Sequence, residues 1–430
     1  MAVVLCVAGP ISVTNTASAS QYQFSTVAGR PAAWGWEDGR TNGCAFYNPN
    51  AMAVDAGGNI YVADSLNHLL RVITPAGEVR TVAGRRLPDD GTGHHESEPG
   101  DGWGSEAHFY YPAGLTLNLA GNLVVADSWH HTLRIVTPEG RVTTLAGAAR
   151  QYGHVDGQGA LARFNNPVGL ALDAVGNVFV ADQGSHTIRK VTPAGEVTTI
   201  AGADGEAGTA DGAARNARFN QPSGLAFDRH GNLYIADNGN SVIRRLTPAG
   251  QVSTLAGAAG LPGHADGSGA AARFWSPAGL AVDGAGNLLV ADRGTHVIRL
   301  VTPAGVVSTL GGTPGNGGLA DGVSEKAQFY SPFGLAVDHD GSLLIADAGN
   351  HVIRRGTPPA EPRLALRMLA GRPHLEVVGV PGRAAVVEYR RAMDDVEGWQ
   401  ELERSALPDG TRSFTDPAGI APQRFYRMRP

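Results

Sequence analysis

Residues 164–202 read FNNPVGLALDAVGNVFVADQGSHTIRKVTPAGEVTTIAG, and this stretch decides the fold. It contains four short runs that are apolar or alternate between apolar and polar residues, as strands do. The turn Asp-Ala-Val-Gly-Asn separates the first two runs, and Thr-Pro-Ala-Gly separates the last two. Asp, Pro and Gly at these positions are typical of hairpin turns. The stretch therefore predicts four antiparallel strands, which we name a, b, c and d in chain order.

The same unit occurs six times along the chain. An Asp ends run b in every copy; the second follows the first by 63 residues, and the others follow at intervals of 55. These residues are Asp64, Asp127, Asp182, Asp237, Asp292 and Asp347. Repeated four-stranded units are typical of β-propellers, which have about 4 to 8 blades. The sequence thus predicts an all-β fold with a six-bladed propeller over residues 24–356.

The two ends of the array indicate how the ring closes. The last unit has no run d after residues 351–355, whereas FSTVAG at residues 24–29 stands alone before the first unit and matches the d runs. Pairing the two segments would cover a sheet edge that otherwise invites aggregation. We therefore expect the N-terminal segment to supply the outer strand of blade six.

The residues between runs b and c carry a family resemblance. Val-Ala-Asp precedes the pair Asn67-His68, and Ile-Arg follows the pair Asn350-His351, a pattern that resembles the NHL repeat. The resemblance covers residues 24–356 and implies a six-bladed propeller. The other four copies depart from the Asn-His pair, so these two side chains are not a fixed chemical requirement. The departing pairs are His130-His131, Ser185-His186, Asn240-Ser241 and Thr295-His296.

The regions that flank the repeats differ from them in composition. Residues 1–19 end in Ala-Ser-Ala after an apolar stretch, which predicts a signal segment and a secreted or periplasmic protein; a frayed N-terminal extension is the alternative. Residues 363–430 contain short apolar runs and resemble a fibronectin type III-like β-sandwich, joined by a Pro-rich linker at residues 357–362. No window is long and apolar enough to span a membrane.

Charge and cysteine content narrow the classes of partner. The net charge of -6 gives no general attraction for phosphate backbones, so we expect no nucleic-acid partner. After removal of a signal segment only Cys44 remains, because Cys6 lies within it, and no internal disulfide is expected. We expect a monomer.

Each d–a connection carries an Asp-Gly pair, with the Asp eight residues before a Phe. The six copies begin at Asp38, Asp101, Asp156, Asp211, Asp266 and Asp321, and the Phe residues are Phe46, Phe109, Phe164, Phe219, Phe274 and Phe329. Such regular recurrence favours a turn Asp and a Phe packed between blades. The alternative is a ring of metal-binding carboxylates, which would require several oxygens to converge on one site. The same structural interpretation applies to Asp64 and Arg71, which we expect to pair with turn backbone and neighbouring carboxylates.

The residue after each of these Phe residues breaks the sixfold symmetry. It is aromatic in blades one, two, five and six, which are neighbours in a closed ring, and it is Asn165 or Asn220 in blades three and four. Trp34, Trp36, Trp103 and Trp129 would extend this arc. Aromatic side chains anchor peptides and sugars, although these could instead pack the seams between blades. We predict a ligand-binding surface formed by Tyr47, Trp103, Tyr110, Trp129, Trp275 and Tyr330.

The channel-facing positions do not suggest catalysis. In the Pro-x-Gly motif that opens run a, the middle residues are Asn50, Ala113, Val168, Ser223, Ala278 and Phe333. Amidating lyases and lactonases of this fold place metal ligands there, and this set is poor in them. We predict no catalytic residue, no metal and no cofactor.

These observations together predict an extracytoplasmic binding scaffold that recognises a protein or glycan on its long-loop face. That face, which we call the top, carries the d–a connections and the b–c turns. The alternative is a lyase or lactonase-like hydrolase with a metal site on a loop, for which His94, His95, Glu96 and Asp101 are the candidate ligands. A solvated polar loop is the competing interpretation of that cluster, because adjacent His-His-Glu lacks the spacing of metal ligands.

Overall fold

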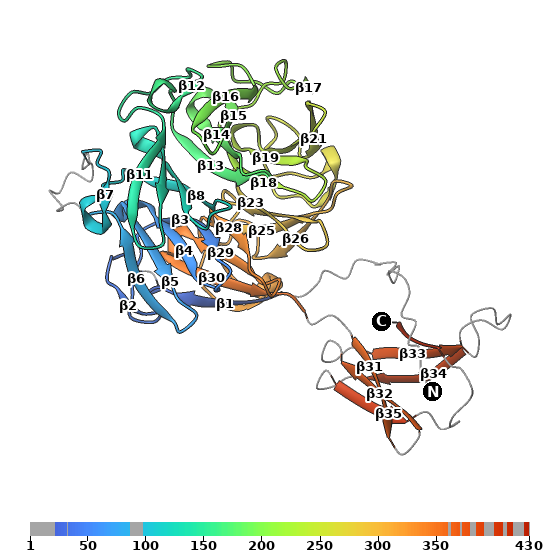
Figure 1. The fold of residues 1–430 in the computed structure, drawn as a ribbon. Coiled ribbons are helices and arrows are strands. Elements are labelled where there is room, and N and C mark those ends of the chain that lie inside the picture. The colour runs from blue at the N-terminus through green and yellow to red at the C-terminus, as the bar shows by residue number, and fades with distance from the viewer. Residues whose placement is uncertain are drawn as a thin grey trace. The chain divides into compact units, whose positions relative to one another are not determined.

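The computed structural model describes residues 22–31, 33–86 and 98–359, together with the backbone of six later strands (Figure 1). The chain divides into two compact units, residues 1–357 and 358–430. The first unit contains six five-stranded antiparallel sheets placed around a ring, so the predicted six-bladed propeller is confirmed. The predicted signal segment and the His94, His95 and Glu96 cluster lie outside the described residues.

The first three blades are built from consecutive strands. Blade one consists of β2 (Gly39–Arg40), β3 (Pro49–Val54), β4 (Ile60–Asp64), β5 (Leu69–Ile73) and β6 (Glu78–Ala83). Blade two consists of β7 (Gly102–Trp103), β8 (Pro112–Leu117), β9 (Leu123–Asp127), β10 (Thr132–Val136) and β11 (Arg141–Ala146). Blade three consists of β12 (Gly157–Gln158), β13 (Pro167–Leu172), β14 (Val178–Asp182), β15 (Thr187–Val191) and β16 (Glu196–Ala201).

The remaining blades repeat this plan. Blade four consists of β17 (Gly212–Ala213), β18 (Pro222–Phe227), β19 (Leu233–Asp237), β20 (Val242–Leu246) and β21 (Gln251–Ala256). Blade five consists of β22 (Gly267–Ser268), β23 (Pro277–Val282), β24 (Leu288–Asp292), β25 (Val297–Val301) and β26 (Val306–Gly311). Blade six consists of β27 (Gly322–Val323), β28 (Leu335–Val337), β29 (Leu343–Asp347), β30 (Val352–Thr357) and the N-terminal β1 (Gln23–Ala28).

Short 3-10 helices occupy two kinds of connection. Five of the b–c turns contain η1 (Ser65–Asn67), η3 (Ser128–His130), η5 (Gln183–Ser185), η6 (Asn238–Asn240) and η9 (Ala348–Asn350). Four of the d–a connections contain η2 (Gly104–Glu106), η4 (Gly159–Leu161), η7 (Gly269–Ala271) and η8 (Ser324–Lys326).

The ring closes as the sequence predicted. β1 pairs with β30, with Ser25 opposite Arg355, and it pairs on its other side with β27. Phe24 is fully buried and makes an edge contact with Phe329 at a centroid distance of 5.1 Å. The N-terminal strand therefore completes blade six and ties it to the packed interior.

Each blade has a fifth, two-residue strand that the repeat pattern did not predict. In blade two, β7 pairs with the start of β11 and places Trp103 opposite Arg141. Because β11 begins at the lower end of the blade, the d–a connection descends along the outer edge and then returns to the top at Phe109. The long connections therefore cover the outer edges of the sheets as well as the top face.

A buried ion-pair network recurs inside every blade, and we call it the Asp–Arg–Asp frame. In blade one, Arg71 donates to Asp64 Oδ2 at 2.9 Å and to Asp38 Oδ1 at 2.7 Å. Thr81 donates to Asp38 from both its N–H and its hydroxyl. The six frames are Asp38–Arg71–Asp64, Asp101–Arg134–Asp127, Asp156–Arg189–Asp182, Asp211–Arg244–Asp237, Asp266–Arg299–Asp292 and Asp321–Arg354–Asp347.

The frame supports the structural interpretation of these residues. Arg71 is fully buried, and its guanidinium lies 5.3 Å from the centroid of the Phe46 ring. Burial raises the pKa of Asp64 to about 6, and the Arg71 charge opposes that shift. Removing one partner of such a pair leaves an uncompensated buried charge, at a cost of about 3–5 kcal/mol. The repeated Asp, Arg and Phe residues are thus part of the blade interior.

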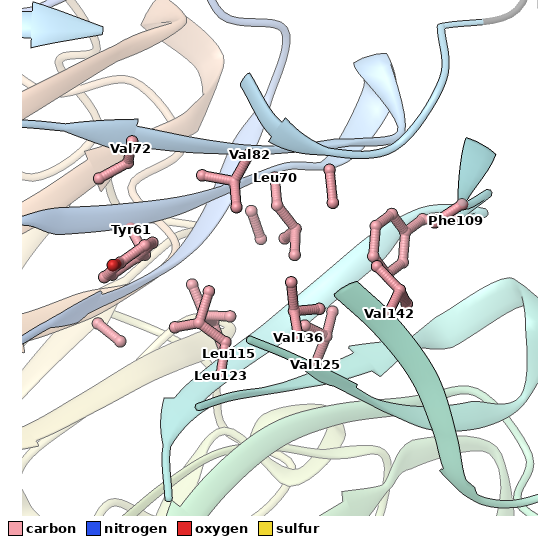
Figure 2. Close-up of a cluster of buried hydrophobic side chains, with 14 residues drawn as sticks. Tyr61, Leu70, Val72, Val82, Phe109, Leu115, Leu123, Val125, Val136 and Val142 are labelled. Carbon is pink, nitrogen blue, oxygen red and sulfur yellow. The ribbon is translucent and has the colours of Figure 1, made fainter. Parts of the chain in front are cut away.

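The seams between blades are packed with aliphatic and aromatic side chains. Figure 2 shows the cluster between blades one and two, where Val72 and Val82 face Val125 and Val136. Phe109, from the returning d–a connection, lies at one end of this cluster. Each seam buries a continuous apolar layer, which is the main stabilising contribution in a protein interior.

The innermost strands approach one another closely around the axis. A Cβ atom added to Gly114 would lie 1.8 Å from the carbonyl oxygen of Val168 in the next blade, and one on Gly169 would lie 1.9 Å from that of Ser223. The Pro-x-Gly motif therefore requires its Gly for packing between blades. Blade one departs from this pattern and has Ala51 at the same position.

The second unit contains two three-stranded antiparallel sheets. One sheet consists of β31 (Arg363–Leu369), β32 (Arg372–Val378) and β35 (Thr411–Thr415). The other consists of β34 (Gln400–Ala406), β33 (Ala384–Arg390) and β36 (Phe425–Arg429). Short strands occur within residues 363–430, as the apolar runs of this region indicated. The fibronectin type III-like sandwich stays a prediction.

Candidate binding face

The top face is held together by histidines that bridge consecutive blades. His68 has a left-handed backbone with φ 60°, and its Nδ1 accepts the backbone N–H of Tyr111 in the next blade at 3.1 Å. His351 accepts the N–H of Asn48 at 3.2 Å. Because His351 belongs to blade six and Asn48 to blade one, the same contact also joins the last blade to the first. The seam histidines are His68, His131, His186, His296 and His351. Blade four has Ser241 at this position.

The seam histidines are adapted to accept hydrogen bonds. Burial lowers the pKa of His131, His186, His296 and His351 below its ordinary value. A neutral imidazole keeps one nitrogen lone pair, whereas a protonated ring has two donors and no acceptor. The sequence by itself does not indicate this role, because the partners of these histidines lie in the neighbouring blade.

Three of the predicted aromatic residues, Tyr47, Tyr110 and Tyr330, lie against seam histidines. Tyr47 contacts the His351 ring at a centroid distance of 5.5 Å, and Trp34 stacks on Tyr47 at 5.1 Å. Tyr330 lies 5.0 Å from the His296 ring in the same manner. Tyr152, which was not among the predicted binding residues, lies 5.9 Å from the His131 ring. Tyr152 directly precedes Gly153, just as Trp34 precedes Gly35, so a comparison of the repeats would have indicated it.

Tyr110 and Trp129 form a denser aromatic group on blade two. Their rings make an edge contact at 4.8 Å, and Tyr110 also lies 5.4 Å from the His68 ring. Trp129 stacks on Tyr111 at 4.6 Å with an interplanar angle of 13°. Both side chains are half-buried, so part of the predicted arc contributes to packing.

Exposure separates the predicted residues into two groups. Trp275 is 56% exposed and Tyr330 is 49% exposed, whereas Tyr47, Tyr110 and Trp129 are half-buried. Trp103 is also exposed, but its pairing with Arg141 places it at the outer edge and lower end of blade two. The structure therefore brings five of the six predicted residues to the top face and places Trp103 elsewhere.

The innermost segments of the blades leave a narrow mouth at the axis, where Asn50 and Ser223 are the polar side chains of the cavity lining. A cavity of about 60 Å³ is lined by β3, β8, β13, β18, β23 and Phe333–Leu335, that is, by the innermost segment of every blade. The Tyr111 hydroxyl accepts hydrogen bonds from the side-chain amides of Asn48 and Asn50, at 3.2 Å and 2.9 Å. Arg293, from the b–c turn of blade five, lies 5.7 Å from the centroid of the Phe333 ring at the edge of this mouth.

Two properties of the described residues bear on other kinds of function. Within residues 22–31, 33–86 and 98–359 and the later strands, no three His, Cys, Asp or Glu side chains are grouped closely enough to hold a metal ion. No helix in that part of the chain has the length and apolar character needed to cross a membrane.

Comparison with protein families identifies the repeat. The model of the NHL repeat matches residues 46–73, 109–136, 219–246 and 274–299, which fall in blades one, two, four and five. The chain thus contains NHL repeats, in agreement with the resemblance seen in its sequence.

Several curated proteins are similar over most of the propeller. The chain is 32% identical over 272 residues to Protein SUPPRESSOR OF QUENCHING 1, chloroplastic, of Arabidopsis thaliana, covering 59% of this chain and 26% of that protein. It is 28% identical to NHL repeat-containing protein 2 of Bos taurus, covering 71% of this chain and 46% of that protein. Teneurin-3 of Mus musculus is 28% identical, over 74% of this chain and 12% of its own length. The chain spans less than half the length of these relatives.

Solved structures share the fold at lower identity. An auxiliary nutrient binding protein from Bacteroides ovatus has a TM-score of 0.58 and 19% identity, covering 79% of this chain and 77% of that one. A second protein of that name, from Bacteroides thetaiotaomicron, has a TM-score of 0.59 and 17% identity, covering 79% and 76%. These similarities show the fold.

Proposed function

We propose that this NHL-repeat propeller is an extracytoplasmic binding scaffold that recognises a protein or glycan partner on its top face. The observation that carries the proposal is the exposure of Trp275 and Tyr330 on a closed, rigid ring. Large exposed aromatic side chains are costly to leave in water and are common at the centres of binding sites.

The backbone beneath these two side chains is firmly held. The N–H of Trp275 donates to the buried carboxylate of Asp292 at 2.8 Å, and the N–H of Tyr330 donates to Asp347 at 2.7 Å. Both carboxylates belong to the Asp–Arg–Asp frames. An aromatic side chain on such a fixed backbone loses little conformational entropy when a partner binds.

Other observations agree with this role. Two of the solved propellers with this fold are named auxiliary nutrient binding proteins, which is compatible with a binding role for the architecture. Location outside the cytoplasm follows from the signal segment predicted over residues 1–19.

A glycan array and a peptide array probed with the full chain test the proposal. The double variant Trp275→Ala with Tyr330→Ala is expected to lose at least about tenfold in affinity for whatever the wild type retains, since each anchor contributes more than 1 kcal/mol. The matched control is Asn165→Ala with Asn220→Ala, which alters the same position in blades three and four. The control is expected to bind as the wild type does.

Two results would contradict the proposal. If the wild type retains neither glycans nor peptides, the top face is not a recognition surface for either class. If both double variants lose affinity equally, binding does not depend on the aromatic residues.

A further inference from the structure

We propose that the mouth of the axial channel binds the acidic end group of a saccharide, with a sugar hydroxyl at Asn50 and a carboxylate at Arg293. This inference rests on the proposed binding function of the top face and adds a substrate class to it. It begins from a buried amide oxygen that has no hydrogen-bond partner among the described residues.

Asn50 is only 1% exposed, and it lines the axial cavity. Its Nδ2 donates to the Tyr111 hydroxyl at 2.9 Å, while its Oδ1 has no hydrogen-bond partner among the described residues. Turning the amide over would exchange the two atoms and leave the nitrogen unpaired instead. A buried polar atom without a partner is costly, and in native proteins it usually marks a bound water, ion or ligand group.

The size of the cavity limits what can reach this amide. A volume of about 60 Å³ holds on the order of four water molecules, which is too little for a sugar ring. A single hydroxyl or hydroxymethyl group that projects from a ring outside the mouth would fit. A hydroxyl can donate to the amide oxygen or accept from the amide nitrogen, so it satisfies Asn50 in either orientation.

Arg293 supplies the charge selectivity. Its Nε donates to the Ser331 hydroxyl at 2.9 Å, and its guanidinium lies near the Phe333 ring, whereas its two terminal nitrogens have no acceptor among the described residues. The equivalent residues of the other b–c turns are Ser65, Ser128, Gln183, Asn238 and Ala348, so Arg293 is the only charged side chain at this position. A guanidinium with free donors recognises carboxylates with two parallel hydrogen bonds.

The segment Phe333–Gly334 of blade six connects the two groups. Phe333 belongs to the inner segment of blade six, and the position next to it, Gly334, is in close contact with the backbone of Asn50 in blade one. The Arg293 guanidinium lies 5.7 Å from the centroid of the Phe333 ring. Asn50 and Arg293 are therefore both neighbours of the segment Phe333–Gly334, and the Phe333 side chain is only half-buried.

A saccharide fits this arrangement better than the C-terminus of a peptide. Both ligands have a carboxylate, but the backbone of a C-terminal residue carries no hydroxyl beside it that could reach Asn50. A sugar acid presents hydroxyls on the ring beside its carboxylate, and its ring face can lie against an aromatic side chain. The exposed Trp275 ring lies beside Gly294, the residue that follows Arg293.

Calorimetric titration of the full chain with D-glucuronic acid and D-glucose tests the inference, because the two sugars differ only in the carboxylate. We expect the wild type to bind the acid at least about tenfold more tightly. Arg293→Gln should remove this preference. The matched control, Arg229→Gln, removes the same charge from an exposed a–b turn at the lower end of blade four and should keep it.

A second variant separates the contribution of Asn50. Asn50→Ala should weaken both sugars to the same extent, by about fivefold, because it removes a hydrogen bond to a hydroxyl that both possess. If this variant does not fold, the Arg293→Gln titration decides alone.

Three outcomes would overturn the inference. Equal binding of the two sugars would exclude recognition of the carboxylate. An equal effect of the Arg293 and Arg229 variants would show that this recognition does not depend on Arg293 in particular. Preference for a tripeptide with a free C-terminus over both sugars would assign the mouth to a peptide. In each case, the proposed function would still hold if the Trp275→Ala and Tyr330→Ala double variant lost array binding. It would fail if the wild type bound nothing on either array.

Discussion

The interior of the blades and the top face follow opposite rules. The Asp–Arg–Asp frame is present in all six blades with nearly the same geometry, with Arg–Asp distances of 2.6–3.0 Å in all but one case. The top face differs from blade to blade: Trp275 and Tyr330 lie where Asn165 and Asn220 lie on the other side of the ring. Residues that repeat hold the ring together, and residues that vary are free to recognise a partner. The following predictions test that distinction, in order of decreasing effect on stability.

The closure of the ring should have the largest effect. Deleting residues 20–30 removes β1 and exposes the edge of β30, so we expect the cooperative unfolding transition of the propeller to be lost. Phe24→Ala should cost about 3–5 kcal/mol, the range for a buried aromatic side chain. Urea denaturation followed by circular dichroism measures both. Ser25→Ala on the same strand is the control, and a loss as large as that of Phe24→Ala would indicate a backbone effect.

Breaking one frame should come next. Arg244→Ala leaves Asp237 buried without its charged partner, and we expect a loss of about 3–5 kcal/mol in the free energy of unfolding. Arg299→Ala should cost less, because Arg299 lies 3.5 Å from Asp292, compared with 2.8 Å between Arg244 and Asp237. Equal losses in the two variants would mean that the frame is insensitive to this distance.

The seam histidines should have a smaller effect that depends on pH. His186→Ala removes the acceptor for the Gln221 N–H and should cost about 1 kcal/mol at pH 7.5. Because the folded-state pKa of His186 is lowered, its contribution is complete above pH 6.5, the ordinary pKa, and is lost as the pH falls. The difference in stability between wild type and variant should therefore shrink from pH 7.5 to pH 5.

A comparison of the two proteins isolates this effect. The raised pKa values of Asp182 and Asp292, both about 7, act in the opposite direction, but they are present in both proteins and cancel in the difference. A difference that stays constant between pH 7.5 and pH 5 would show that His186 acts through packing alone.

The exposed aromatic residues should matter least for stability. The Trp275→Ala and Tyr330→Ala double variant should unfold within about 1 kcal/mol of the wild type, because both side chains are half exposed. Differential scanning calorimetry measures the shift. A loss of 3 kcal/mol or more would place these side chains among the packing residues of the seams, and the distinction between interior and top face would fail there.

Much of the fold was predictable because its information is local and repeated. Turn residues and alternating runs define each strand, and the isolated FSTVAG segment indicated the closure. The fifth strands were not predictable, since two residues such as Gly102 and Trp103 show no periodicity. Trp103 was therefore assigned to the aromatic surface by proximity in sequence, although its strand leads to the other end of the blade.

The candidate site was predictable only in part, for a related reason. Aromatic residues that break the sixfold repeat can be found by comparing one copy of the repeat with the next, and Trp275 and Tyr330 were found in this way. The role of His351, which bonds Asn48 some 300 residues away in sequence, depends on contact between blades. The unpaired amide oxygen of Asn50 could not be inferred at all, because whether a buried atom finds a partner depends on its packed surroundings.

By itself the sequence determined the number of blades, the four main strands of each, the segment that closes the ring and the structural nature of the repeated Asp, Arg and Phe. Each of these follows from short-range pattern, because strand alternation and turn chemistry act over a few residues. The tertiary structure alone decided which side chains meet across the seams, which aromatic residues stay exposed and which polar groups surround the axis. Those properties arise where separate blades come into contact, and no single repeat contains them.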